Sequence, residues 1–417
     1  MYDVTIIGAG ASGVMCALAL KEKNKSLKVL LLEKNDKLGK KLSITGNGRC
    51  NLGNTNTDIS NFNSDSNLSD FKNVLEVDNF DFLNVLDNTD DMESYYDYLI
   101  RCGVLITKEK EYLYPYSMQA ITVCKSFERY LNYLNVAVKY SYDVVKVTKN
   151  KDVFIINDDI KSKVIVVATG GKSYPKTGST GFGYNVLKSF GHTITDLYPS
   201  LTHLKTDYKH IKDLQGVRVN AVTSLSVDGW IEKQEEGQVQ FTHDALSGIC
   251  IFNLSRYVKK YLNENKTVKI KMDLVPDYSG LELQSYIASF SSYKLQDALS
   301  CIINNKLAVA ITKELKYTNM LVKELNKNEL DGVCFTLKNM YFNITDTGDF
   351  NTAQITSGGV KLDEFTKGLE SSKCKGLYAV GEVLDVDGKC GGYNLSWAFN
   401  SAIIAANDIL RRDHEKS

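Results

Sequence analysis

Residues 2–13 read YDVTIIGAGASG, and this stretch together with the residues that follow it decides the fold. The run 2–7 is short and rich in β-branched residues, which is typical of a strand, and residues 14–23 have the composition of a helix. A second apolar run, KVLLL at 28–32, predicts a strand buried on both faces, as in a parallel sheet covered by helices. The chain therefore begins with a strand, a tight turn, a helix and a parallel strand.

The turn carries the spacing GxGxxG, formed by Gly8, Gly10 and Gly13. The first glycine permits the tight turn, the second lets the backbone approach a pyrophosphate, and the third lets helix and strand pack closely. The phosphates would meet the N–H groups and the positive dipole end of the helix. Glu33 follows Gly13 by twenty residues and ends the next strand, where a carboxylate can bind an adenosine ribose and disfavours a 2′-phosphate. The motif predicts NAD or FAD binding.

Two later segments favour FAD over NAD. A buried strand at 163–168 runs into Thr169-Gly170-Gly171, and a strand at 376–380 runs into Gly381-Glu382. Both look like the turns by which FAD domains of the glutathione-reductase type hold a long flavin nucleotide. We therefore predict an α/β fold with a Rossmann-like FAD-binding domain, closed by a helix over residues 394–410.

Composition shifts predict that this domain is interrupted. We expect a discontinuous FAD-binding domain over 1–195 and 350–417, a β-rich insert over 196–275 and 333–349, and a helical insert over 276–332. Within the first part, residues 54–91 are dominated by Asn, Asp and Ser, which predicts a solvated loop with a helix near 80–85. Helices are expected at 92–102 and 117–134, and a small antiparallel element at 136–142, 144–147 and 153–156.

Overall composition excludes several classes of protein. Fifty basic residues balance fifty acidic residues, so the net charge predicts neither a DNA-wrapping protein nor an acidic binder. The nine cysteines include no CxxC pair, HExxH is absent and the five histidines are scattered, so no metal site is expected. The apolar stretch 4–20 follows Asp3 and is broken by glycines, unlike a signal peptide. We expect a soluble cytoplasmic protein with free thiols and no membrane association.

The chain resembles the BaiN/RdsA-type flavoproteins, a family also known as aminoacetone-oxidase-like. The resemblance lies in GAGASG at 8–13, GKKLSITGNGRCN at 39–51, ATGGKSYPKTGSTGFGY at 168–184, FTHDALSG at 241–248 and GEVLDVDGKCGGYNLSWAFNSA at 381–402. These segments occur in order over nearly the whole chain, and GRCN together with GEVLDVDG and GGYN is close to diagnostic. The resemblance implies an FAD domain with a β-rich and a small helical insert.

The resemblance also implies a set of cofactor-binding residues. Those of the ADP half are Gly8, Gly10, Ala11, Ser12, Gly13, Glu33 and Lys34. Those around the flavin are Lys41, Gly48, Arg49 and Asn51. The later turns contribute Thr169, Gly170, Gly381, Glu382, Asp385, Gly392, Tyr393 and Asn394. Since residues 391–394 open the last helix, its N–H groups and dipole can face the flavin N1 and C2 carbonyl, although Asn394 as an ordinary N-cap fits equally well.

Two side chains are candidates for proton transfer. Cys50 lies between Arg49 and Asn51, and a neighbouring guanidinium would favour a thiolate and a pKa near neutrality. The alternative is a small buried residue packed under the flavin. His243 in FTHDALSG is either a structural histidine or a group that binds substrate or moves a proton.

The resemblance implies that hydride passes from NAD(P)H through FAD to an activated C=C bond. The acceptor would be a uridine of large-subunit ribosomal RNA or a conjugated 3-oxo bile acid. No second dinucleotide fingerprint is present, so nicotinamide would bind transiently. Amine oxidation of aminoacetone and a non-catalytic flavin-containing factor remain alternatives. An RNA substrate would need a local basic face, for which the candidates are Arg256, Lys259, Lys260, Lys266, Lys269 and Lys271, although a charge run is usually a solvated face.

Overall fold

The computed structural model describes residues 1–75 and 94–414, and it divides into two compact units. The first unit comprises residues 1–197 and 355–417, and the second comprises residues 198–354. The helix expected near residues 80–85 lies outside the described residues. Each unit has its own hydrophobic core, so each is described by itself.

Within its described residues, the first unit is built on a seven-stranded sheet in the order β7-β2-β1-β10-β9-β8, with β19 also paired to β10. The strands are β1 (Tyr2–Ile7), β2 (Val29–Leu32), β7 (Ala137–Lys139), β8 (Val147–Asn150), β9 (Val153–Ile156), β10 (Ile160–Val167) and β19 (Leu377–Ala379). β1 pairs in parallel with β2 and β10, and β10 pairs in parallel with β19. The predicted parallel strands 2–7, 28–32, 163–168 and 376–380 therefore lie side by side in one sheet.

The long strand β10 changes its partner halfway along. Its first residues, from Ile160 to Ser162, pair antiparallel with β9, and its last residues, from Ile165 to Val167, pair with β19. The expectation of an antiparallel element is correct for 153–156, which is β9, but its antiparallel partner β8 begins at residue 147 and not at 144, and the expectation is wrong for β7. Residues 137–139 instead pair in parallel with β2, at the edge of the main sheet. Three residues are too short for periodicity to distinguish the two arrangements.

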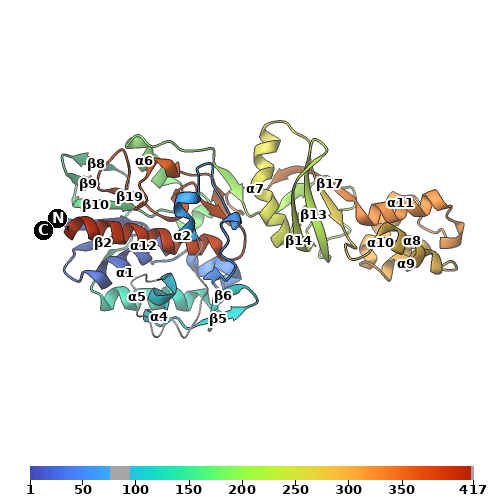
Figure 1. The fold of residues 1–417 in the computed structure, drawn as a ribbon, viewed down its shortest axis with the longest axis horizontal. Coiled ribbons are helices and arrows are strands. Elements are labelled where there is room, and N and C mark those ends of the chain that lie inside the picture. The colour runs from blue at the N-terminus through green and yellow to red at the C-terminus, as the bar shows by residue number, and fades with distance from the viewer. Residues whose placement is uncertain (76–93, 415–417) are drawn as a thin grey trace. The chain divides into compact units, whose positions relative to one another are not determined.

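Helices cover this sheet, and the last helix lies alongside the first (Figure 1). The α-helices described in the first unit, outside residues 76–93 and 415–417, are α1 (Ala11–Lys23), α2 (Lys72–Leu75), α4 (Tyr95–Arg101), α5 (Ala120–Tyr133), α6 (Phe182–Ser189) and α12 (Tyr393–His414). α1 is buried almost all round because sheet and helices enclose it, which agrees with the apolar run over residues 14–20. Two small sheets complete the unit, formed by β3 (Gly53–Asn54), β6 (Tyr112–Pro115) and β5 (Ile106–Glu109), and by β4 (Phe62–Asn63) and β20 (Asp387–Gly388).

The second unit contains a closed barrel in the order β12-β15-β14-β13-β16-β17. Its strands are β12 (Leu204–Thr206), β13 (Arg218–Val227), β14 (Trp230–Phe241), β15 (Ala245–Ser247), β16 (Val268–Asp273) and β17 (Met340–Thr347). A helix that was not expected, α7 (Ile249–Asn263), packs on the barrel with its apolar face, including Ile251, Leu254 and Val258. The helices α8 (Gly280–Ser289), α9 (Leu295–Ser300), α10 (Asn305–Glu314) and α11 (Lys327–Lys338) form the remainder.

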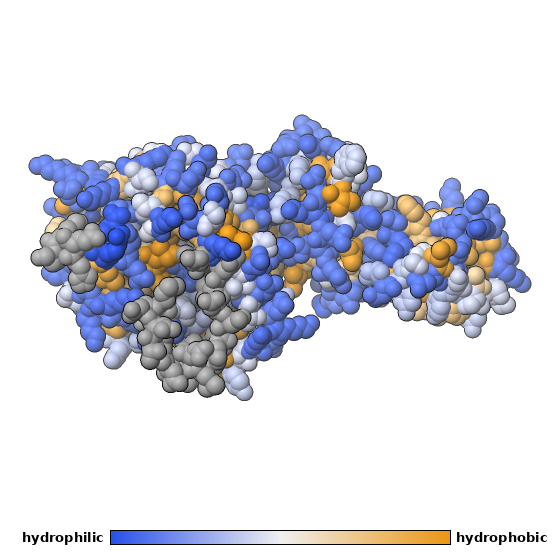
Figure 2. All heavy atoms as spheres, viewed as in Figure 1, coloured by the Kyte–Doolittle hydropathy of each residue, from blue (hydrophilic) through white to orange (hydrophobic). Residues whose placement is uncertain are grey.

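The face of the molecule shown in Figure 2 is mostly hydrophilic, with apolar side chains in separate small patches. No helix in the part of the chain that the structure describes combines the length and the apolar composition needed to cross a bilayer. All nine cysteines fall within the described residues, and all of them are free thiols.

Candidate active site

The glycine turn between β1 and α1 has the geometry that its spacing predicts. Gly8 has a φ of +106°, and a Cβ added there would lie 2.5 Å from the Ala168 carbonyl oxygen. A Cβ at Gly13 would lie 1.8 Å from the Gly8 carbonyl oxygen, so only glycine lets helix and turn approach this closely. A Cβ at Gly10 would meet no atom within 4 Å. The first and third glycines thus close the turn, and the second borders open space.

The open space at Gly10 lies at the N-terminus of α1. Gly10 is the N-cap residue, and no side chain caps the helix there. The first N–H groups of an α-helix, here those of Ala11, Ser12 and Gly13, have no partner within the helix and favour an anion. The turn therefore offers backbone donors and a positive dipole end beside a gap that a side chain would fill. This arrangement fits a pyrophosphate.

Glu33 lies at the end of β2 and is 7% exposed. Its Oε2 accepts a hydrogen bond from the Ala9 N–H at 2.9 Å, and its Oε1 accepts from the backbone and side-chain nitrogens of Asn35 at 2.8 and 2.6 Å. A carboxylate oxygen accepts about two hydrogen bonds, so Oε1 is fully used and Oε2 retains capacity for a ribose hydroxyl. The ammonium of the neighbouring Lys34 lies 3.9 Å from the exposed carboxylate of Asp143.

The turns after β10 and β19 meet the start of α1. Gly170 has a φ of +69°, and a Cβ at Gly183 would lie 2.0 Å from Thr169 Oγ1, so α6 packs closely on this turn. A Cβ at Gly381 would lie 2.8 Å from Ser12 Oγ. The carboxyl ends of three parallel strands therefore converge at the glycine turn, which is where open α/β sheets bind their ligands.

Lys41 and Glu382 form an ion pair at this edge of the sheet. The Lys41 ammonium lies 2.8 Å from Glu382 Oε2, and the other carboxylate oxygen accepts the Thr356 N–H at 2.9 Å. Thr356 Oγ1 in turn accepts the backbone N–H of Lys172 at 2.7 Å. The side chains of the pair are only 22% and 19% exposed. The pair thus connects three loops that are distant in sequence.

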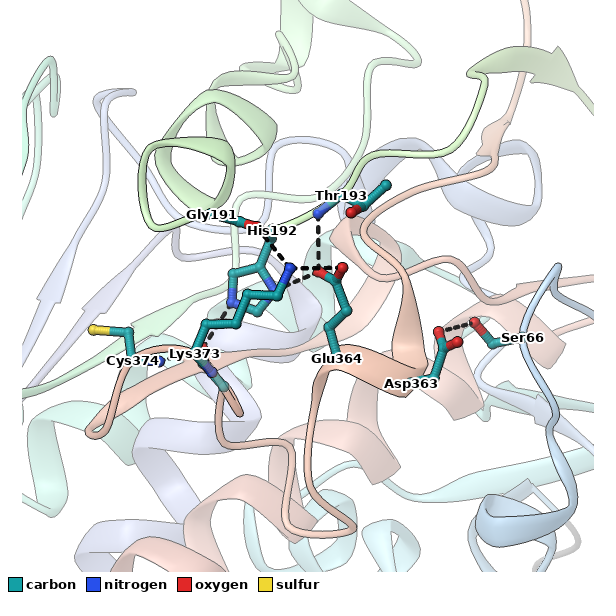
Figure 3. A network of polar contacts seen from close by, with 9 residues as sticks. Ser66, Gly191, His192, Thr193, Asp363, Glu364, Lys373 and Cys374 are labelled. Atoms are coloured by element: carbon teal, nitrogen blue, oxygen red, sulfur yellow. Dashed lines mark hydrogen bonds and ion pairs between the residues drawn. The ribbon is translucent and has the colours of Figure 1, made fainter.

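Asp385 is nearly fully buried, and a second network of polar contacts braces it. Its Oδ2 accepts the Asp65 N–H at 2.9 Å, and the adjacent Ser66 donates its hydroxyl to Asp363 at 2.7 Å. Figure 3 shows the neighbouring cluster, in which Glu364 accepts from Lys373 at 2.7 Å and lies 3.0 Å from His192 Nδ1. Asp385 therefore holds the 64–66 segment in place.

The chemical state of this cluster follows from its burial. Burial lowers the pKa of His192, and the Glu364 carboxylate offsets part of that decrease. Burial alone would raise the pKa of Glu364, but hydrogen bonds from Lys373 and Thr193 lower it to about 2. A neutral histidine and an ionised carboxylate are thus expected at neutral pH. Although Ser371 Oγ lies 2.7 Å from His192 Nε2, it already accepts two backbone N–H bonds, so a nucleophilic role is disfavoured.

The GRCN loop and the GGYN turn lie against each other. A Cβ at Gly392, whose φ is +98°, would lie 2.4 Å from the Gly53 carbonyl oxygen and 2.7 Å from Asn51 Oδ1. With its amide oriented to satisfy both groups, Asn51 donates to the carbonyl oxygens of Gly53 and Leu113 at 2.7 and 3.2 Å. Gly48 has a φ of +82°, and a Cβ there would meet no atom within 4 Å. The structure brings these two sequence segments to one place.

The helix predicted to begin at residues 391–394 is α12, which starts at Tyr393. The Asn394 side chain folds back, since its Oδ1 accepts the Gly388 N–H at 2.8 Å and its Nδ2 donates to the Gly388 carbonyl oxygen at 2.8 Å. Asn394 is therefore inside the first turn and is not an ordinary N-cap. The Tyr393 ring is buried against Phe62, so only its backbone can face a cofactor.

Cys50 differs from the expectation of a thiol with a pKa near neutrality. It is fully buried, and that burial raises the pKa of the thiol to about 12. The Arg49 guanidinium does not offset this, because it lies over the Tyr114 ring, 4.7 Å from its centroid. The prediction of an Arg49-stabilised thiolate is wrong, and the burial of Cys50 agrees with the alternative of a packed residue.

His243 lies in the turn between β14 and β15 of the second unit, and its side chain is exposed. The proposed basic face also belongs to this unit. The Lys259 ammonium lies 2.7 Å from Asp346 Oδ1. The Lys266 ammonium lies 4.0 Å from Glu264 Oε2. On β16, Lys269 and Lys271 alternate with the buried residues Val268, Ile270 and Met272. Part of the positive charge in this segment is therefore neutralised locally.

Three residues of the site were not found from the sequence. Asn35 connects Glu33 to the Thr177 carbonyl oxygen at 3.0 Å, and Thr356 joins Glu382 to the 172–173 turn. Tyr184 is buried, and burial together with the carboxylates of Glu382 and Asp385 raises its pKa. Of these three residues, only Tyr184 belongs to a motif that could have pointed to the site, the segment 168–184. The residues that Tyr184 contacts come from distant parts of the chain, so the sequence could not reveal its surroundings. Among the residues that the structure describes, no cluster of His, Cys, Asp or Glu could hold a metal ion.

The glycine turn, the acid at the end of β2 and the two later turns define a Rossmann-type flavin-dependent oxidoreductase. The chain belongs to the family described as HI0933-like protein Rossmann domain, whose profile matches residues 2–408. This confirms the predicted fold class and the family resemblance. The chain's full-length relatives, described next, are named as reductase and synthase enzymes, so the non-catalytic alternative is wrong.

Three curated relatives match over their whole length. The chain is 30% identical to the 3-dehydro-bile acid delta(4,6)-reductase of Clostridium scindens, covering 99% of this chain and 100% of the relative. It is 25% identical to the ribosomal RNA dihydrouridine synthase of Escherichia coli and 28% identical to that of Haemophilus influenzae, with 98% of each chain covered in both cases.

The residues present fit FAD. The gap at Gly10 and the helix N-terminus suit the pyrophosphate, and Glu33 suits the adenosine ribose. The Asn51 and Gly392 segments supply backbone polar groups beside the start of α12, as the isoalloxazine requires.

Proposed function

We propose that this enzyme takes hydride from NAD(P)H and passes it, through FAD, to a C=C bond conjugated with a carbonyl, and that its acceptor is a uridine of large-subunit ribosomal RNA. The observation that carries the proposal is the full-length match to two relatives named ribosomal RNA dihydrouridine synthase. Uracil presents a C=C bond activated by its C4 carbonyl. A flat flavin also offers a stacking platform for an extruded base.

The chain's own residues would divide the work as follows. When bound, FAD supplies a carrier for hydride between reductant and acceptor. Ala11, Ser12 and Gly13 would donate their N–H groups to the pyrophosphate, and Glu33 would accept from the ribose hydroxyls. The start of α12 would stabilise negative charge on the reduced ring through its dipole.

The Lys41–Glu382 pair would fix the loops around the middle of the cofactor. Because the pair joins the GRCN-side loop to the turn after β19, it would hold the two ends of the site in register. Glycine can contact the cofactor only through its backbone, and such contacts are part of this proposal at Gly8, Gly10, Gly13, Gly48, Gly170, Gly381 and Gly392.

A conjugated steroid or bile-acid enone is the second candidate acceptor. One observation favours it: the relative named as a bile-acid reductase is 30% identical over its entire length, which exceeds the identity to either RNA-modifying relative. An enone and a uracil ring pose the same electronic problem, so the same site would serve both. The difference would lie in the residues that recognise the remainder of the substrate.

The experiment is an anaerobic titration of flavin reoxidation. The holoenzyme is reduced with NADH or NADPH, and unmodified large-subunit RNA or a 3-oxo-Δ4 steroid is then supplied as the acceptor. Aminoacetone, which would donate electrons, is added instead to the oxidised holoenzyme, where reduction of the flavin would indicate amine oxidation. Reoxidation by the RNA with formation of dihydrouridine supports the first proposal, and reoxidation by the steroid alone moves the enone to first place. Reoxidation by neither C=C acceptor contradicts both.

A genetic test addresses the physiological acceptor. Dihydrouridine is mapped in the large-subunit RNA of a deletion strain and of the same strain carrying the gene. Loss of one dihydrouridine with restoration by the gene supports the RNA proposal, and persistence of every dihydrouridine contradicts it. If cations such as Lys269 and Lys271 hold the phosphate backbone, activity on RNA should fall steeply with salt, whereas activity on a neutral enone should not.

A further inference from the structure

We propose that Arg49 polarises the carbonyl of the acceptor and carries the negative charge that develops on its oxygen during hydride transfer. This inference rests on the proposed function and assigns to Arg49 a role toward the substrate, in place of the cofactor contact expected from the sequence. The argument starts from where the loop holds this side chain.

Arg49 lies at the rim of the place where the GRCN loop meets the GGYN turn. Asn51, two residues later, donates to the Leu113 carbonyl oxygen on β6, and the guanidinium covers the ring of the next residue on that strand, Tyr114. Burial raises the pKa of the Tyr114 phenol, Arg49 lowers it, and Cys390 is close enough to add to the increase. Tyr112 on the same strand lies against the GGYN turn, because a Cβ at Gly391 would be 2.9 Å from its ring, so Arg49 is close to both segments that fit the flavin ring.

The Tyr114 ring positions the Arg49 guanidinium, but its hydrogen bonds to protein groups are weak. Its Nη1 lies 3.4 Å from Glu109 Oε2 and its Nη2 lies 3.4 Å from the Tyr114 hydroxyl, both beyond the usual hydrogen-bond length of about 2.7–3.2 Å. The Arg49 side chain is 45% exposed. A guanidinium has five N–H donors, so most of its hydrogen-bonding capacity is available to a ligand. The buried Tyr114 ring fixes one face of the guanidinium plane.

A second arginine of the same unit, Arg101, provides a comparison, because its guanidinium forms a short ion pair. Arg101 lies over the Tyr98 ring at 4.5 Å, and its Nη2 lies 2.8 Å from Glu22 Oε2. That glutamate is 12% exposed, whereas Glu109 beside Arg49 is 50% exposed. The same three residue types thus form a close ion pair under a tyrosine ring between α1 and α4, and a longer one at the site. Arg101 is the matched control for Arg49.

The chemical step balances as follows. The hydride from the reduced cofactor forms a C–H bond at the electrophilic carbon of the acceptor, and the electron pair of the C=C bond moves toward the carbonyl oxygen. The resulting enolate oxygen accepts hydrogen bonds from the Arg49 guanidinium, which stays protonated throughout. A proton from water then adds to the neighbouring carbon, which restores the carbonyl and releases the saturated product.

Binding of a phenol tests this assignment without turnover. 4-Chlorophenol mimics the enolate when it binds as the phenolate, and its affinity for the oxidised holoenzyme is measured by difference absorbance from pH 6 to 9. We expect Arg49→Ala to weaken binding at pH 7 by at least about tenfold, because a charge-assisted hydrogen bond is lost. Arg49→Lys, which keeps the charge but not the planar fork, should fall between the two, and Arg101→Ala should match the native protein.

The half-reactions supply the second readout. Arg49→Ala should retain FAD and its rate of reduction by NAD(P)H within about twofold, while reoxidation by the C=C acceptor should slow about 100-fold, the range for a lost oxyanion donor. Unchanged phenol binding, or absence of phenol binding by the native protein, overturns the assignment. Loss of FAD from both Arg49 variants also overturns the assignment, because it would show that Arg49 binds the cofactor. If the native enzyme reduces no C=C acceptor, the proposed function fails, and phenol binding alone still decides whether Arg49 holds an oxyanion.

Discussion

The Lys41 ammonium lies 2.8 Å from the Glu382 carboxylate, across 341 residues of sequence. Both side chains are mostly buried, so solvent screens the pair less than it would screen a surface ion pair. Glu382 also accepts from the Thr356 backbone, and a Cβ at Gly171 would lie 2.7 Å from Glu382 Oε1. The carboxylate is thus held by two hydrogen-bonding partners and closely approached by the Gly171 backbone, so loss of its cation should weaken cofactor binding.

We expect the two members of this pair to be energetically coupled. Lys41→Met leaves Glu382 without its cation and should weaken FAD retention, and Glu382→Gln should do the same. The double variant should be less impaired than the sum of the two, with a coupling of about 1 kcal/mol. The free energy of FAD binding is measured by fluorescence of the released flavin at two salt concentrations. Strict additivity would show that the two side chains act independently.

Two glycines of the turn should respond in opposite ways to alanine. A methyl at Gly10 meets no protein atom and the φ of −79° suits alanine, so Gly10→Ala should keep the fold and lose FAD affinity. Gly13→Ala places a Cβ 1.8 Å from the Gly8 carbonyl oxygen and should destabilise the fold itself by several kcal/mol, roughly the cost of overpacking. Thermal denaturation of the apoprotein, compared with FAD titration, separates the two effects. Equal loss of stability in both variants would contradict the assignment of the gap to pyrophosphate.

Glu33→Gln should weaken FAD retention about tenfold, because the ribose hydroxyls would lose a charged acceptor worth about 1.5–3 kcal/mol. The substitution should also lower the melting temperature of the apoprotein, since Glu33 Oε2 accepts the Ala9 N–H in the turn itself. Asp143→Asn, which changes an exposed carboxylate in the same way, is the control and should change neither property. Chromatographic quantification of bound FAD and the melting temperature of the apoprotein provide the comparison.

The buried Cys50 thiol should be inert. At pH 8 a short exposure to iodoacetamide should label Cys301, which is exposed, and leave Cys50 unmodified, as peptide mass spectrometry can show. Because burial raises the pKa of Cys50 to about 12, its contribution to stability is complete below the unfolded pKa of about 9. That contribution is lost as pH rises from about 9 toward 12, so Cys50→Ala should flatten the alkaline fall in melting temperature. A native-like alkaline slope in the variant would show that other groups govern it.

Glu364→Gln should weaken the cluster around His192. The pKa of Glu364 is lowered to about 2, so its contribution is present above the unfolded pKa of about 4.5 and is lost as pH falls toward 2. The variant should be less stable at pH 7 by about 2 kcal/mol, the scale of a charge-assisted hydrogen bond, and the difference should shrink below pH 4. Denaturant unfolding at pH 7, 5 and 3.5 measures the change. A constant difference at all three values would contradict an ionised Glu364 in this role.

The sequence was sufficient for the parallel sheet because its signals are local. Buried strands such as β1 and β10 read as apolar runs, and the glycine spacing fixes the turn that connects β1 to α1. β7 has three residues and no such signal, so its pairing with β2 depends on tertiary contacts. α7 was missed because its apolar face, with residues such as Cys250 and Ile251, follows directly on a strand pattern.

In the candidate site, too, some residues could be predicted from local spacing, and others depend on tertiary contacts. Glu33 and the glycines could be predicted because they lie within one βαβ unit, where spacing determines position. The burial of Cys50 could not, because its neighbours include Cys124, which is distant in sequence. The contacts of Arg49 with Tyr114 and Glu109 also depend on β5 and β6, which no motif places beside the GRCN loop.

The discontinuous first unit has a consequence for synthesis of the protein. β19 and α12 complete the sheet and cover α1, yet they are encoded after the whole second unit. On the ribosome, the nascent chain therefore exposes the apolar surface of α1 until translation reaches α12, while the barrel can already fold. During that interval the unfinished flavin fold is a natural client for chaperones, and FAD can be captured only late, when Trp397 and Ser401 hydrogen-bond the Gly381 backbone and close the site.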